Sequence, residues 1–286
     1  MPKPTPAELL AAVTEAARLA GRILSERFTQ ARTIELKGEI DLVTDADKAS
    51  EEVLLRFIHA RYPDHGVLAE ESGLSVAAGP YRWLVDPLDG TTNYAHRVPH
   101  FCVSVAVEGP SGLVAAAVLD PLRDELFAAG RGLGATLNGQ PIRPSGAAGL
   151  DRALLCTGFP YDIQVRPEAP LGLFNHFIRR AQGVRRMGSA ALDLAYVASG
   201  RFDGFFEFGL QAWDIAAGAL LVEEAGGVMR QIDGAVLDLR RGDVLAAAPG
   251  LSEELIDECR EFLKEIGWRL RPSPQPSPRG RGGTSS

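Results

Sequence analysis

Two carboxylates lie three residues apart where a short apolar run ends, Asp86 and Asp89. The preceding residues 83–85 have the length and composition of a buried strand. The proline between the two carboxylates fixes φ and has no N–H, and the glycine after them allows a sharp turn. A rigid turn that directs Asp86, the carbonyl of Leu88 and Asp89 to one point makes an all-oxygen site. Such a site suits a hard cation such as Mg²⁺.

Other acidic residues along the chain bear on this interpretation. Residues 90–93 are ordinary turn formers, so a strand followed by an Asx-type turn is the alternative. However, carboxylates also stand at expected strand ends or helix starts at Asp47, at Glu70 with Glu71, and at Asp214. A fold that gathers them needs cations to offset their repulsion. Around two Mg²⁺ ions they would form a two-metal site for phosphoryl transfer to water.

The composition is that of a globular chain with an acidic balance. Its 286 residues suit one large domain or two moderate ones, and 45% apolar residues are enough for a core. The formal charge of −7 argues against direct nucleic-acid binding. The three separated cysteines indicate reduced thiols in a cytoplasm, and the five histidines show no zinc-site spacing. Neither a signal peptide nor a membrane-spanning run is expected.

Hydrophobic periodicity predicts alternating helices and strands. Helices are expected at residues 6–28, 45–61, 171–182, 190–197, 214–225 and 252–266. Strands are expected at residues 33–36, 67–69, 83–85, 101–108, 113–119, 125–129, 135–138, 153–157, 184–187, 202–207, 228–232 and 244–247. Residues 75–80 are expected to form a loop, and residues 138–139 a tight turn. The order predicts a layered fold of the α+β or α/β class.

The chain divides at a Pro/Gly/Ser-rich stretch near residue 146. We expect residues 1–146 to form an α+β domain with most of the metal ligands. Residues 147–270 are expected to form an α/β domain with the leaving-group pocket and Asp214. Residues 271–286 are rich in Pro, Ser, Arg and Gly and are predicted to be disordered.

Four short motifs occur in order along the chain. They are Asp41-Leu42-Val43-Thr44, Glu70-Glu71-Ser72, Asp86-Pro87-Leu88-Asp89-Gly90-Thr91-Thr92-Asn93 and Trp213-Asp214-Ile215-Ala216-Ala217-Gly218. Together they resemble the inositol monophosphatase family of the lithium-sensitive, magnesium-dependent phosphatases. Residues 186–195 are similar to bacterial members, and the resemblance extends from residue 5 to about residue 268.

The resemblance implies a metal site, carried over position by position. Glu70, Asp86 and the Leu88 carbonyl would hold a first Mg²⁺. A second Mg²⁺ would bind Asp86, Asp89 and Asp214, and Glu70 would also reach a weaker third ion. Each residue has an ordinary structural alternative, and for Asp214 that alternative is a helix N-cap.

The resemblance also implies catalytic and substrate contacts. Thr91 and Asp47 would orient the attacking water, and Thr91, Asp47 and Glu70 form the catalytic set. Backbone N–H groups of Gly90 and Thr91, at a helix start, would face the phosphate. The residues implied in substrate binding are Asp89, Gly90, Thr91, Gly188, Ser189, Ala190, Glu207 and Asp214. As alternatives, Asp47 could be a first-turn charge favoured by the helix dipole and Glu207 a partner of an arginine.

Two further groups are left with a structural assignment or an open one. Lys37 is equally compatible with a surface lysine and with a place near the site. His96 and His100 are taken as structural.

The fold and activity implied by the resemblance are a layered αβαβα sandwich, a homodimer, and a cytoplasmic, lithium-sensitive phosphomonoesterase for a small phosphate ester. Inositol 1-phosphate or a similar polyol phosphate is the expected substrate, because Ser189, Ala190 and Glu207 offer hydrogen-bond partners. Histidinol phosphate, fructose 1,6-bisphosphate and 3′-phosphonucleotides are the alternatives within the same chemistry. A regulatory binding protein in an RNA-associated complex is the alternative from another class.

Overall fold

The structure is a computed structural model that describes residues 3–30, 34–36 and 42–268. Its helices are α1 (Pro6–Phe28), α2 (Asp45–Arg61), α3 (Thr91–Ala95), α4 (Glu168–Ile178), α5 (Ala190–Ala198), α6 (Ala212–Glu224) and α7 (Ser252–Glu265), with a 3-10 turn at Leu150–Arg152. Its strands are β1 (Ile34–Leu36), β2 (Leu42–Thr44), β3 (Gly66–Ala69), β4 (Gly73–Ser75), β5 (Arg82–Asp89), β6 (Cys102–Gly109), β7 (Gly112–Asp120), β8 (Glu125–Gly130), β9 (Gly134–Leu137), β10 (Gln140–Pro141), β11 (Leu154–Thr157), β12 (Gly183–Arg185), β13 (Gly204–Glu207), β14 (Val228–Gln231) and β15 (Val244–Ala247).

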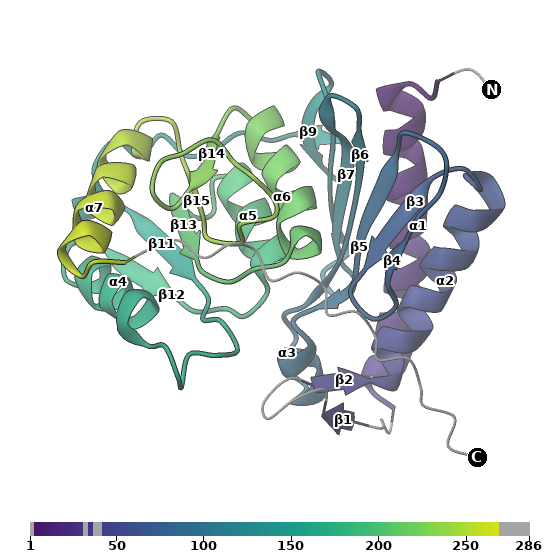
Figure 1. Cartoon of the computed structure of the whole chain (residues 1–286), viewed down its shortest axis with the longest axis horizontal. Coiled ribbons are helices and arrows are strands. Elements are labelled where there is room, and N and C mark those ends of the chain that lie inside the picture. Colours follow the sequence, from purple (N-terminus) through teal and green to yellow (C-terminus); the bar gives the residue numbers. More distant parts are fainter. Residues whose placement is uncertain (1–2, 31–33, 37–41, 269–286) are drawn as a thin grey trace, which may run out of the picture.

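The elements stack in five layers, as the family resemblance implies (Figure 1). Helices α1 and α2 cover the outer face of an eight-stranded sheet of order β10-β9-β8-β7-β6-β5-β3-β4. Helices α5 and α6 lie between this sheet and a five-stranded sheet of order β12-β11-β13-β15-β14, whose outer face carries α4 and α7. The layered αβαβα sandwich is therefore confirmed.

Strand β5 leads into the predicted metal-binding turn at residues 86–90, which is called the metal turn below. The side chains of β5 point alternately into two hydrophobic cores. Trp83 and Val85 of β5 pack with α1 and α2, whereas Leu84 packs with α5 and α6. Successive side chains of a strand point to opposite faces, so a strand covered by helices on both sides is apolar throughout. This explains the continuous apolar run that precedes Asp86.

Helix α5 is buried on all sides because it lies between the two sheets. It approaches α6 so closely that a Cβ added at Gly218 would overlap the Cβ of Leu194. A glycine in the middle of a helix is otherwise unfavourable. Gly218 is therefore required by the close approach of the two central helices.

We expect Gly218→Ala to destabilise the protein. Overpacking costs about 1–3 kcal/mol, and the gain in helix propensity of about 1 kcal/mol offsets only part of it. The melting temperature should fall, as measured by circular dichroism. Gly146→Ala is the control, because an added methyl there meets nothing within 4 Å. Equal melting temperatures for Gly218→Ala and the parent would contradict the close-packing argument.

The structure corrects several predicted element boundaries. The helix expected at residues 171–182 is α4, which begins at Glu168 and ends at Ile178. Pro170 does not prevent the earlier start, because a residue in the first helical turn has no intrahelical acceptor for its N–H. Asp214 is the third residue of α6 rather than its first or its N-cap. Strands β2, β4 and β10 were not predicted, and each is only two or three residues long.

A larger correction concerns the metal turn itself. Strand β5 does not end at Val85 but continues through Pro87 to Asp89. Its pairing with β6 changes register between Asp86 and Asp89, so the extra length forms a β-bulge. A proline is tolerated at such a position because no ladder hydrogen bond is required of it.

Two other predictions remain as they were. The division near residue 146 stays a prediction, although the eight-stranded sheet precedes it and the five-stranded sheet follows it. Residues 271–286 and Lys37 lie outside the described residues. Among the helices of the described ranges, none is long and apolar enough to cross a membrane.

Candidate active site

Local hydrogen bonds define the shape of the bulge at the end of β5. The hydroxyl of Ser50, on α2, donates to the carbonyl of Pro87 at 2.8 Å. The backbone N–H of Leu88 donates to Oδ1 of Asp86 at 2.9 Å. Asp86 and Asp89 are therefore held on either side of a backbone segment that is anchored to α2.

Glu70 directly follows β3, and β3 is the parallel neighbour of β5. Glu70 therefore lies beside this bulge. Ala69 pairs with Val85, and the N–H of Glu70 donates to the carbonyl of Val85 at 3.1 Å. The next N–H, that of Glu71, donates to the carboxylate of Glu51 on α2 at 2.9 Å. The sheet register thus brings Glu70 to Asp86, and α2 supports the loop that follows.

Asp214 reaches the same place from the other half of the chain. It is the third residue of α6, and its Oδ2 accepts from the N–H of Gln211 at 2.7 Å in a capping box. The carbonyl of Trp213 accepts from the hydroxyl of Ser104 on β6 at 3.2 Å. The start of α6 is therefore joined to the sheet that carries Asp86 and Asp89.

These elements enclose a cavity of about 420 Å³ between the two halves. All the predicted metal-binding and substrate-binding residues line it: Glu70, Asp86, Leu88, Asp89, Gly90, Thr91, Gly188, Ser189, Ala190, Glu207 and Asp214. Asp47 does not line the cavity but is buried beneath Thr91. The structure therefore brings the predicted set together from both halves of the chain.

Thr91 and Asp47 form a buried pair. The Thr91 hydroxyl lies 3.0 Å from Oδ1 of Asp47 and 3.0 Å from the carbonyl of Leu88. The other oxygen of Asp47 accepts from the N–H and the hydroxyl of Thr44, in a capping box at the start of α2. Asp47 is thus both a helix-capping residue and a partner of Thr91, so its structural and functional interpretations are compatible.

Asp89 is held by the start of α5. Its Oδ2 accepts from the Ser189 hydroxyl and from the N–H of Ala191, both at 2.7 Å. The Cys102 thiol is a weaker donor to the same oxygen at 3.7 Å. The structure therefore places the Ser189 hydroxyl on Asp89, where the resemblance implied a contact with substrate.

Burial and mutual repulsion disfavour the charged forms of these carboxylates. Burial, followed by the charges of Glu70, Asp89 and Asp214, raises the pKa of Asp86 well above its usual range. Burial and the charge of Asp89 do the same to the pKa of Asp214. Burial raises the pKa of Asp89, although its hydrogen bonds oppose the shift. A bound cation would reverse this balance.

The donor set fits a hard divalent cation by its chemistry, since it consists of carboxylate and carbonyl oxygens. The carboxylates face one cavity, but in the described ranges no three His, Cys, Asp or Glu side chains form a ready-made cluster around a single point. Asp86, Asp89 and Asp214 each use an oxygen to accept from a backbone N–H. Metal binding therefore requires small side-chain movements within the cavity.

The metal-free protein should lose stability as the pH rises. The folded state keeps protons on Asp86, Asp89, Asp214 and Glu207 above the pH at which the unfolded chain releases them. For Glu207, the folded state binds more protons than the unfolded chain between about pH 4.5 and about pH 8. The free energy of unfolding therefore decreases as the pH rises through this range. We expect melting temperatures of metal-free protein to fall across this range. Saturating Mg²⁺ should flatten the slope, whereas NaCl of equal ionic strength should not. A slope unchanged by Mg²⁺ would argue against a metal in the cavity.

Glu207 forms the far side of the cavity at the end of β13. Burial raises its pKa to about 8, and the positive charge of Arg186 only partly opposes the shift. A Cβ added at Gly158 would overlap the Glu207 carboxylate, so this side chain packs directly on a glycine backbone. At neutral pH Glu207 is therefore mainly a neutral carboxylic acid that can donate as well as accept.

The sequence interpretation missed several residues that line the cavity. Phe159 and Tyr161 follow strand β11, Phe208 follows β13, and Arg186 follows β12. Their common signal is a position within four residues after a strand of the second sheet, where polar and aromatic side chains reach the edge. His100 does not line the cavity and is buried in ring contact with Tyr196, in agreement with its structural assignment.

Sequence comparison agrees with the geometry. The sequence model of the inositol monophosphatase family matches residues 5–264. The chain is a member of the inositol monophosphatase family. The match covers both halves, and so includes both sides of the cavity. Membership of the inositol monophosphatase family supports a phosphatase. The expected homodimer, cytoplasmic location and lithium sensitivity stay predictions.

The chain is also similar to individual proteins over most of its length. The chain is 42% identical over 260 residues to a protein of Salmonella typhimurium named Nus factor SuhB, covering 90% of this chain and 97% of the relative. It is 45% identical over 244 residues to the inositol-1-monophosphatase of Synechocystis sp., covering 85% of each. The solved structure of inositol monophosphatase from Anabaena sp. has a TM-score of 0.79 and 42% identity, covering 92% of this chain and 96% of that chain.

Proposed function

We propose that this protein is a Mg²⁺-dependent phosphomonoesterase for myo-inositol 1-phosphate or a similar polyol phosphate. The observation that carries the proposal is the joining of an acidic cavity to the buried Thr91–Asp47 pair. The residues that would hold the metal are Glu70, Asp86, Asp89, Asp214 and the carbonyl of Leu88. Mg²⁺ at these oxygens would lower the pKa of a water molecule and neutralise phosphate charge.

Thr91 and Asp47 supply the water-orienting part of the site. The Thr91 hydroxyl has one hydrogen, which it can donate to Asp47. The lone pairs of the Thr91 hydroxyl oxygen then remain available to accept a hydrogen bond from the attacking water. The Asp47 carboxylate is buried, so it holds the Thr91 hydroxyl in this orientation in a low-dielectric environment. Together the two residues direct an oxygen lone pair of the water towards the phosphate.

The far side of the cavity suits a hydroxylated leaving group. Glu207 can both donate and accept at neutral pH, since its pKa is raised to about 8. A polyol presents several hydroxyls that need such partners, whereas a nucleoside would rely more on stacking. Phe159 and Tyr161 also line the cavity, so 3′-phosphonucleotides belong in any test.

A panel of phosphate esters with Mg²⁺ tests the substrate. Inositol 1-phosphate should be hydrolysed with a higher kcat/KM than histidinol phosphate, fructose 1,6-bisphosphate or a 3′-phosphonucleotide. Glu207→Leu should raise KM for inositol 1-phosphate more than KM for p-nitrophenyl phosphate, because leucine neither donates nor accepts hydrogen bonds and p-nitrophenyl phosphate offers no hydroxyls to this position. Equal effects of Glu207→Leu on both esters would show that Glu207 does not select the leaving group. A higher kcat/KM for another ester would replace the proposed substrate.

Phosphate release should depend strictly on Mg²⁺. A chelator should abolish release from inositol 1-phosphate, and added Mg²⁺ should restore it, because oxygens make up the whole proposed ligand set. High Ca²⁺ should inhibit, since its looser coordination misplaces the reacting groups. Full activity in rigorously metal-free buffer would rule out the mechanism.

We also propose a second candidate function, a regulatory binding role, on a narrower ground. The 42% identical Salmonella typhimurium relative carries the name Nus factor. In a strain that lacks this relative, the chain should then reverse whatever phenotype the loss causes, even when catalysis is removed by Asp89→Asn. Restoration by the parent chain but not by Asp89→Asn would favour the phosphatase role alone.

A further inference from the structure

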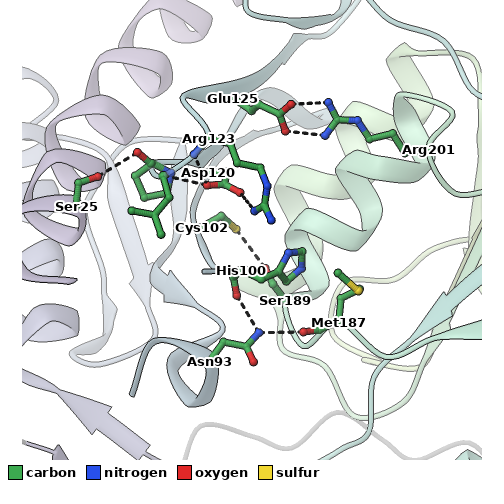
Figure 2. Close-up of polar contacts among 12 residues, drawn as sticks. Ser25, Asn93, His100, Cys102, Asp120, Arg123, Glu125, Met187, Ser189 and Arg201 are labelled. Carbon is green, nitrogen blue, oxygen red and sulfur yellow. Dashed lines mark hydrogen bonds and ion pairs between the residues drawn. The ribbon is translucent and has the colours of Figure 1, made fainter. Parts of the chain in front are cut away.

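The side-chain amide of Asn93 joins three backbone segments next to the metal turn. Asn93 is the third residue of α3. Its Nδ2 donates to the carbonyl of His100 at 2.8 Å and to that of Met187 at 2.9 Å (Figure 2). The carbonyl of Gly188 lies 3.4 Å from the same nitrogen. Because all these neighbours are carbonyl oxygens, only the NH₂ end of the amide fits this position. The amide therefore connects the two halves of the chain.

The backbone segments around this amide are packed closely against one another. Gly90 and Gly188 have φ values of +98° and +91°, which favour glycine. A Cβ at Gly90 would lie 3.1 Å from the carbonyl of His100 and 3.2 Å from that of Gly188. A Cβ at Gly188 would lie 3.1 Å from Nδ2 of Asn93. A shift of one segment is thus transmitted directly to the others.

The segments that Asn93 holds carry the donors of Asp89. Ser189 directly follows Gly188, and its hydroxyl donates to Oδ2 of Asp89 at 2.7 Å. Cys102 follows the His100 segment, and its thiol lies 3.7 Å from the same oxygen and 3.5 Å from the Ser189 hydroxyl. Figure 2 shows Cys102 facing Ser189 close to the Asn93 contacts. Each carbonyl that accepts from Asn93 therefore lies within two residues of a side chain that donates to Asp89.

We infer that Asn93 is a positioning residue that sets the orientation of Asp89 by tying the start of α5 to the metal turn. The inference rests on the proposed function only in treating Asp89 as a metal ligand. Asn93 also lines the cavity, but its Nδ2 donates to backbone carbonyls, so in this role it acts through Asp89. Residues that orient a metal ligand affect metal affinity or activity by about 10–100-fold.

Variants of Asn93 test this role through metal binding as well as turnover. Asn93→Ala should raise the Mg²⁺ dissociation constant by about tenfold, as fitted from melting temperatures measured across a Mg²⁺ series. It should lower kcat for inositol 1-phosphate more than it changes KM. Asn93→Asp should be worse than Asn93→Ala, because a carboxylate of similar size would face the carbonyl oxygens without a proton to donate. If Asn93→Ala does not fold, Asn93→Ser takes its place, since its hydroxyl is a single donor of shorter reach.

Asn138→Ala is the matched control. Asn138 also bonds backbone groups through its side chain, since its Oδ1 accepts from the N–H of Leu126 at 2.9 Å and its Nδ2 donates to the carbonyl of Asp124 at 2.8 Å. It lies in the hairpin between β9 and β10, away from the cavity. Asn138→Ala should lower the melting temperature and leave the Mg²⁺ dependence unchanged.

A double-mutant cycle with Ser189→Ala identifies the route of the effect. If Asn93 acts through the start of α5, the double variant should bind Mg²⁺ little more weakly than the weaker-binding single variant. Additive effects, or an Asn93→Ala variant that loses stability but keeps parental Mg²⁺ dependence and kcat, would overturn the inference. A parent chain that binds Mg²⁺ but hydrolyses no ester would refute the proposed function alone, and the melting assay would still support or overturn the role of Asn93.

Discussion

Asp89→Asn should lower turnover by about 10³-fold or more, if the metal that Asp89 is proposed to hold stabilises the leaving oxygen. The substitution removes one negative charge from the proposed second metal site. The side-chain oxygen that accepts from Ser189 and Ala191 can be retained by the amide, so the start of α5 should stay in place. The loss should therefore appear in kcat and in the Mg²⁺ concentration needed, measured by phosphate release across a Mg²⁺ series.

Asp120→Asn is the control for loss of a buried charge. Asp120 is more deeply buried than Asp89 but lies outside the cavity, and its Oδ1 accepts from the N–H groups of Leu122 and Arg123 at 3.0 Å each. This variant should lose stability without a change in Mg²⁺ dependence. If Asp89→Asn kept the parental Mg²⁺ dependence and turnover, Asp89 would not be a metal ligand.

Thr91→Ala should lower turnover by about 10²-fold or more, as expected for loss of the group that assists the water. The hydroxyl that lies 3.0 Å from Asp47 is removed, but every proposed metal ligand remains. The Mg²⁺ dissociation constant fitted from the melting temperatures should therefore stay close to that of the parent chain. Steady-state kinetics and melting curves across the same Mg²⁺ series measure the two quantities.

Thr91→Ser is the matched variant, because it keeps the hydroxyl and loses only a methyl group. It should recover most of the activity that Thr91→Ala loses. A Thr91→Ala variant whose Mg²⁺ binding is weakened as much as that of Asp89→Asn would contradict the division into ligand and water-orienting residues. In that case the contact between the Thr91 hydroxyl and the carbonyl of Leu88, which the parent chain has, would be holding the metal turn as one structural unit.

Helix starts show how much local sequence determines. The capping boxes of Thr5 with Glu8 and of Thr44 with Asp47 were predictable because they need only residues three positions apart. The apolar alternation that places Trp83 and Leu84 on opposite faces of β5 is equally local. Short strands such as β4 were missed because three residues carry too little pattern.

The bulge at Pro87 shows where local reasoning failed. Proline and glycine predicted a turn after Val85, yet the strand continues to Asp89 because β6 pairs with it through a register shift. Whether a proline ends a strand depends on which of its backbone groups a neighbouring strand requires. That neighbour begins only at Cys102, so residues 83–90 alone could not decide the outcome.

The sequence by itself determined which residues of this protein are candidates to bind a metal and to orient water, because side-chain chemistry and the motifs that carry the family resemblance are local properties. The tertiary structure alone decided that Asp214 shares a cavity with Asp86, that Ser189 holds Asp89 from 100 residues away, and that Asn93 holds Met187 from 94 residues away. Such contacts arise because α5 and α6 must bury their apolar surfaces against both sheets. That packing brings the two halves of the chain to the same edge, and with them the residues of the site.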